Sequence, residues 1–144
     1  MTKGIVISLY DFTGEALKPW AEAGYTCYAY DIQHSKDNVN TDTFVGSEGS
    51  ITYCHADLHD PDTQLDLFQR WRHAGVTFGM AFPVCTDMAV SGAAHFKRKA
   101  ERDPDFQTKA VSYAVDCAEL FNDLGCPYFV ENPVSVLATK WRKP

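Results

Sequence analysis

Cys85 stands where a thiol could act as a nucleophile. It follows an apolar segment, residues 76–82, that predicts a buried strand, and only Pro83 and Val84 separate it from that segment. In a parallel α/β sheet ligands bind beyond the carboxyl ends of the strands, where backbone amides or a basic neighbour could lower the pKa of a thiol. We therefore expect Cys85 to be a nucleophile, whereas most single cysteines are small buried hydrophobic residues.

A carboxyl group stands in the corresponding place on another predicted strand. Glu131 ends the apolar segment 127–131, and Asn132 comes directly after it. No histidine is placed to activate the thiol, so a hydrolase is disfavoured. A cysteine with a carboxylic acid suits activation of a heterocycle: the sulfur adds to the ring while the acid protonates or hydrogen-bonds a ring nitrogen.

Three further acids come after predicted strands. The first strand, residues 4–10, leads into Asp11, Thr13 and Gly14. A glycine there lets the backbone approach a ligand, and a helix N-terminus favours polar groups, although an ordinary strand-to-helix turn explains the segment equally well. It is not a GxGxxG loop, so a pyrophosphate cradle is poorly supported.

Asp31 and Asp57 end the second and third predicted strands, residues 26–32 and 51–57. Asp31 is placed to accept hydrogen bonds from ribose hydroxyls, which would serve NAD and S-adenosylmethionine alike. Asp57 could accept from an adenine amino group or could simply cap the following turn. Both interpretations of Asp57 stay open from the sequence.

The remaining cysteines and histidines point away from a metal or a disulfide framework. The five cysteines include no CxxC pair, and Cys27, Cys54 and Cys117 are interpreted as buried hydrophobic residues. Reduced thiols predict a cytoplasmic protein. His55 and His59 are four residues apart with no third ligand at a suitable spacing, so we predict no metal site.

The elements that must position these residues alternate along the chain. Besides the strands named above, helices are predicted at residues 15–24, 62–73 and 106–124, and residues 33–50 are predicted to form a polar loop. This alternation predicts one α/β domain spanning residues 1–144, with a doubly wound, mainly parallel sheet and helices on both faces. The near-continuous apolar strands agree, because such a sheet is covered on both faces.

Composition and charge limit the classes of function that the chain could have. The chain of 144 residues is 45% hydrophobic and 22% charged, and no apolar run approaches the ~20 residues of a membrane-spanning helix. We therefore expect no membrane partner. The net charge of −6 counts against a nucleic-acid binder, but basic residues cluster at two places. The first cluster is Lys97, Arg98, Lys99 and Arg102, and the second is Lys140, Arg142 and Lys143.

The motifs taken together resemble those of cytosine-C5 DNA methyltransferases, especially short phage-type members. "SLYDFTG" is similar to their cofactor motif, "FPVCTDMAVSG" to their nucleophile loop and "VENP" to their glutamate-asparagine motif, in the expected order. The segment "VSVLATKWRKP" also resembles the residues after that glutamate in the phage-type branch. The resemblance implies a Rossmann-like methyltransferase fold with S-adenosylmethionine as cofactor and DNA as partner.

The resemblance also implies residue roles. Cys85 would add to C6 of cytosine, Glu131 would stabilise the charge at N3, and Asn132 would orient the loop that holds the nucleophile. C5 would then accept the methyl group, and the base must leave the duplex to reach the thiolate. The implied cofactor-binding residues are Tyr10, Asp11, Phe12, Thr13, Gly14, Asp31, Ile32, Asp57, Leu58 and Pro83.

The chain departs from the family pattern in three respects. Val84 stands where the family usually has proline, and Phe12 where it tends to have glycine. The chain stops soon after the glutamate motif, so we expect the N-terminal part of the family domain without the target-recognition region, and self-association through an open sheet edge. Two alternatives are a non-catalytic module that binds S-adenosylmethionine and an NAD-dependent oxidoreductase.

Overall fold

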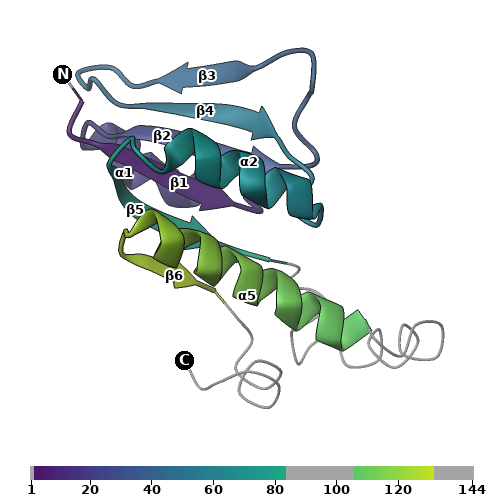
Figure 1. The fold of residues 1–144 in the computed structure, drawn as a ribbon. Helices are drawn as coiled ribbons and strands as arrows, with labels where there is room; N and C mark the ends of the chain where they lie inside the picture. Colours follow the sequence, from purple (N-terminus) through teal and green to yellow (C-terminus); the bar gives the residue numbers. More distant parts are fainter. Residues whose placement is uncertain (1, 84–105, 132–144) are drawn as a thin grey trace.

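The fold is built on one sheet of mostly parallel strands. A computed structural model describes residues 2–83 and 106–131, and within these ranges the sheet has the order β3-β4-β2-β1-β5-β6 (Figure 1). β1, β2, β4, β5 and β6 run parallel to one another, and β3 is antiparallel to β4. The strands are β1 (Ile5–Leu9), β2 (Thr26–Asp31), β3 (Asn40–Thr43), β4 (Ser50–His55), β5 (Val76–Ala81) and β6 (Tyr128–Val130).

Helices cover both faces of this sheet. On one face, a 3₁₀ turn η1 (Glu15–Leu17) and the short α1 (Lys18–Glu22) bury Leu17 and Ala21 against Val6, Cys27 and Ile51. On the other face, α2 (Pro61–Trp71) and α5 (Phe106–Leu124) pack side by side against the strands (Figure 1). Their core contains Ile7, Leu9, Tyr30, Leu67, Trp71, Cys117, Leu120 and Phe121.

The winding of the chain agrees with the sequence-based prediction. From β1 the strands are added outward on one side through β2 and β4, and then on the other side through β5 and β6. The mainly parallel sheet with helices on both faces is thus confirmed, and the arrangement is compatible with a Rossmann-like α/β fold. The predicted bounds of the long helix, residues 106–124, are confirmed by α5.

The prediction of a loop over residues 33–50 is wrong in its middle part, because β3 lies there. All four residues of β3 are exposed and polar, so no apolar alternation marks the strand. Its contacts come from β4 instead: the Tyr53 hydroxyl donates to Asp42 at 2.8 Å, and the Thr41 and Thr52 hydroxyls lie 3.1 Å apart. Cross-strand pairing therefore stabilises a segment whose own sequence carries no strand signal.

Two of the predicted helices differ from the structure in their bounds. The predicted helix 15–24 is split into η1 and α1, with Pro19 in the first turn of α1, where a missing N–H costs nothing. The helix predicted at residues 62–73 spans Pro61–Trp71; its Leu65 is 53% exposed, whereas Leu67 is buried. The helix packs on the sheet through Leu67 and Trp71.

Candidate functional site at the strand ends

Parallel pairing brings the predicted motifs to one edge of the sheet. Backbone hydrogen bonds continue the ladders past the strands, from Asp11 N to Tyr30 O and from Ala56 N to Asp31 O. On the other side, Phe82 N donates to Leu9 O and Glu131 N donates to Ala81 O at 2.9 Å. The segments after β1, β2, β4, β5 and β6 therefore meet at this carboxyl edge.

The turn after β1 is fixed by Asp11. Its buried carboxylate accepts the Ser8 hydroxyl at 2.8 Å and the Gly14 backbone N–H at 2.8 Å. The chain reaches this turn through Tyr10, whose φ of 58° is left-handed and uncommon for a residue other than glycine. Asp11 thus shapes the turn, with each carboxylate oxygen already holding a donor.

Gly14 is required at its position for two reasons. Its φ is 71°, and an added Cβ would lie 2.9 Å from the ring of Tyr53. Thr13 is exposed, and its hydroxyl accepts from the Glu15 N–H at 3.3 Å. The turn is therefore closed against β4 and leaves no space for a side chain at residue 14.

Two histidines, His34 and His55, support this turn. This role of the two histidines was not predicted from the sequence. His34 Nε2 lies 3.1 Å from the Asp11 carbonyl oxygen, and His55 Nδ1 lies 3.0 Å from the His34 carbonyl oxygen. A carbonyl oxygen only accepts, so each of these ring nitrogens must carry the hydrogen. The half-exposed ring of Phe12 stacks on His34 with centroids 5.3 Å apart. No sequence signal distinguished these histidines from solvated ones.

A small cavity of 60 Å³ opens among the strand ends. It is lined by Tyr10, Asp31, Ile32, Ala56, Asp57, Leu58 and His59. Of the predicted cofactor-binding residues, Tyr10, Asp31, Ile32, Asp57 and Leu58 thus come together around one space. Asp11, Phe12, Thr13 and Gly14 form the adjoining turn, and Pro83 is fully buried after β5.

The two acids at the cavity each keep one carboxylate oxygen available. Asp31 accepts the Gln33 N–H at 2.8 Å, and Asp57 accepts the His59 N–H at 3.2 Å, each through Oδ1. Their Oδ2 atoms have no hydrogen-bond partner within residues 2–83 and 106–131. Asp57 therefore stabilises the turn that follows β4, which agrees with one of the two interpretations of this residue. The N-cap of α2 is a different residue, Asp60. Ile32, beside Asp31, is 58% exposed.

Tyr10 and His59 close the side of the cavity that faces α5. The ring of His59 stacks on Tyr113 with centroids 3.6 Å apart, and Tyr10 lies 5.7 Å from His59. The Tyr10 hydroxyl is buried and has no hydrogen-bond partner among the described residues. Burial raises the pKa of the Tyr10 phenol above its ordinary value, and repulsion from Cys117 and Tyr113 adds to the rise. The hydroxyl therefore keeps its proton.

The thiols within the described part of the chain are poor nucleophiles. Cys27 and Cys117 are fully buried, as predicted, and burial raises the pKa of each to about 12. Burial also raises the pKa of Cys54 and of Cys126. Cys54 is only half-buried. A thiolate nucleophile is therefore not expected from any of these four cysteines.

The predicted catalytic residues are only partly within the described ranges. The side chain of Glu131 is exposed directly after β6, and β6 pairs with β5 through Ala81 and Val130. Cys85 and Asn132 lie outside the described residues. The chain therefore leaves the sheet toward Cys85 and at Glu131 from two neighbouring parallel strands, β5 and β6.

Within residues 2–83 and 106–131, no group of three or more His, Cys, Asp or Glu side chains could hold a metal ion. No helix of that same part of the chain is long and apolar enough to cross a membrane.

Comparison of the chain with protein-family models, with curated proteins and with solved structures finds no match.

Proposed function

We propose that the chain binds S-adenosylmethionine at the carboxyl edge of the sheet and transfers its methyl group to C5 of cytosine in DNA. The observation that carries the proposal is the shared cavity. Tyr10, Asp31 and Asp57 come from three motifs far apart in the sequence, yet they line one space. The Rossmann-like methyltransferase fold, with Cys85 as the nucleophile, is part of the same proposal.

The residues around the cavity fit a nucleoside. The free oxygen of Asp31 can accept from ribose hydroxyls, and that of Asp57 from an exocyclic amino group. Exposed Ile32 and the apolar Leu58 offer contact to the face of a base. At 60 Å³ the space is smaller than the roughly 300 Å³ of a typical ligand pocket, so it would enclose one edge of the ligand. The remainder would lie over residues 10–14.

The charge of the turn favours S-adenosylmethionine over NAD. The Gly14 N–H, which a phosphate would need, already donates to the Asp11 carboxylate, and Glu15 begins η1. Two carboxylates at this helix start repel a pyrophosphate, whereas they tolerate the cationic sulfonium and ammonium of S-adenosylmethionine. The oxidoreductase alternative is therefore disfavoured by the turn itself.

The chemistry assigned to the chain's own residues rests on the acid and the thiol. When bound, S-adenosylmethionine supplies an electrophilic methyl group. The Cys85 thiolate would form a bond to C6 of an extruded cytosine while Glu131 donates a proton to N3, which makes C5 electron-rich. After C5 has taken the methyl group, the C5 proton would pass to solvent water, the Cys85 sulfur would leave C6 as a thiolate, and the N3 proton would return to the Glu131 carboxylate. These steps would restore the aromatic ring and regenerate both side chains.

Cofactor binding is tested by titrating the purified chain with S-adenosylmethionine in a calorimeter. We expect saturable binding that Asp31→Asn weakens by about tenfold or more, because the ribose loses a charged acceptor. Asp66→Asn, an equal change at an exposed position on α2, should leave binding unchanged. No binding by the folded wild-type chain would contradict the proposed function.

Catalysis is tested separately, with DNA in which 5-fluorocytosine replaces cytosine. Fluorine cannot leave C5 as a proton does, so the Cys85 adduct should persist as a covalent complex visible by denaturing electrophoresis. Cys85→Ala should abolish that complex and methyl transfer while S-adenosylmethionine binding remains. Binding without any adduct in the wild-type chain would favour the non-catalytic module instead.

A further inference from the structure

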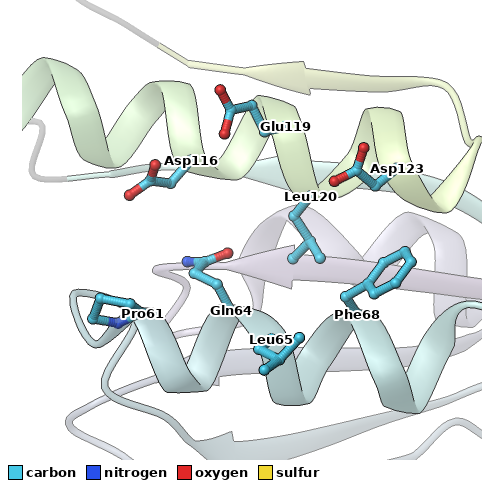
Figure 2. A pocket seen from close by; sticks show the side chains of 8 residues that line it. All are labelled: Pro61, Gln64, Leu65, Phe68, Asp116, Glu119, Leu120 and Asp123. Atoms are coloured by element: carbon cyan, nitrogen blue, oxygen red, sulfur yellow. The ribbon is translucent and has the colours of Figure 1, made fainter.

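A second and larger hollow lies away from the strand ends, between α2 and α5. Its volume is 360 Å³, and it shares no residue with the cavity around Asp31. Figure 2 shows the two helices facing each other across it, with Leu120 pointing toward α2 and Phe68 toward α5. The groove is lined by Pro61, Gln64, Leu65, Phe68, Asp116, Glu119, Leu120 and Asp123.

The floor of this groove is apolar. On α2, the lining residues keep the i, i+3, i+4, i+7 spacing of one helix face, from Pro61 to Phe68. Leu65 of this face is 53% exposed. Exposed apolar side chains in a groove between two helices are the usual seat of an amphipathic helix.

The α5 side of the groove is acidic. Asp116, Glu119 and Asp123 are spaced i, i+3, i+7 and extend over about 10 Å of the helix. None of them forms an ion pair with a cation of the described residues. Burial raises the pKa of Asp116, and repulsion from Glu119 raises it further. Gln64, the polar lining residue of α2, already donates through Nε2 to the Leu58 carbonyl oxygen. The polar groups that the groove offers to a partner are therefore mainly the three carboxylates of α5, which accept hydrogen bonds from a cation.

We propose that this groove docks a basic amphipathic helix of a partner protein. Its apolar residues would cover Leu65, Phe68 and Leu120, and its lysines or arginines would pair with the three carboxylates of α5. Charge complementarity selects this occupant, because an acidic segment or a nucleic acid would be repelled by the row of carboxylates. The proposal is independent of methyl transfer, since the two sites share no lining residue.

The test uses two synthetic amphipathic peptides with the same leucine face, one carrying lysines and the other glutamates at the remaining positions. Fluorescence anisotropy of the labelled peptides should show saturable binding of the lysine peptide to the wild-type chain and none of the glutamate peptide. The combined change Asp116→Asn, Glu119→Gln and Asp123→Asn should weaken binding about tenfold. Leu65→Ser should also weaken it.

Matched variants separate this groove from general attraction to an acidic protein. Glu22→Gln, Asp37→Asn and Asp66→Asn remove the same charge from exposed positions outside the groove, and Val45→Ser removes a fully exposed apolar side chain elsewhere. Both controls should bind the lysine peptide as the wild type does. Equal weakening by the control set, equal binding of both peptides, or no binding would each overturn the proposal. A concentration-dependent dimer abolished by Leu65→Ser would overturn it in favour of a second copy.

Discussion

Single residues at the carboxyl edge differ in whether their polar atoms are satisfied. Asp11 holds donors on both carboxylate oxygens, and Tyr30 accepts the Trp71 Nε1–H at 3.1 Å within the core. The Tyr10 hydroxyl, in contrast, is buried without a partner among the described residues. A buried hydroxyl without a hydrogen bond costs free energy, so Tyr10 is a place where the fold is less stable than it could be.

Tyr10→Phe is therefore expected to leave the free energy of unfolding unchanged or to raise it by up to about 1 kcal/mol. Tyr30→Phe removes an equivalent hydroxyl but leaves the buried Trp71 N–H unpaired, and it should cost about 1–3 kcal/mol. Urea denaturation of both variants measures the contrast. A loss of more than about 1 kcal/mol in Tyr10→Phe would mean that its hydroxyl has a partner.

At the scale of elements, the packing of α5 on β5 depends on a residue without a side chain. A Cβ at Gly79 would overlap the ring of Phe121, which itself stacks on Tyr128 of β6 with centroids 5.6 Å apart. Gly79 is also the residue that pairs with Tyr128 in the sheet, and β6 leads directly to Glu131, whose N–H donates to the Ala81 carbonyl oxygen.

Gly79→Ala should destabilise the protein by about 1–3 kcal/mol, because the ring of Phe121 must move. The expected loss is opposite to the intrinsic backbone preference, because alanine loses less conformational entropy than glycine when it is ordered in a strand. Denaturant titration measures it, and the same change made in a Phe121→Leu background should cost less. Equal costs in both backgrounds would show that the methyl group does not meet Phe121.

On the scale of the whole molecule, the two cores bury groups that ionise at alkaline pH. Cys27 lies in the core under α1 and Cys117 in the core under α5, and burial raises the pKa of each from 9.0 to about 12. The pKa of Tyr30 also rises, from 10.0 to about 12. The folded chain therefore holds protons that the unfolded chain releases above pH 9.

The contribution of these groups to the free energy of unfolding should therefore be constant below pH 9. It should decrease as the pH rises from 9 toward 12, because the unfolded chain then releases protons that the folded chain keeps. Each fully buried thiol contributes a slope of up to about 1.4 kcal/mol per pH unit in this window. Urea unfolding at a series of pH values, under reducing conditions, measures the slope. Cys27→Ala should make it shallower while lowering stability at pH 7, and an unchanged slope would contradict the assignment to this thiol.

The sequence by itself determined the alternation of strands and helices, the bounds of α5 and the acids at the strand ends. These depend on local patterns: apolar runs, helical spacing, and the rule that parallel strands end at one edge. Tertiary structure alone decided the strand order, the antiparallel β3, the exposure of Leu65 and the histidines that hold the Asp11 turn. β3 is stabilised by Tyr53 and Thr52 of another strand, and Leu65 faces a groove because α2 packs on the sheet through Leu67 and Trp71. Such outcomes depend on contacts between distant segments, which no local pattern encodes.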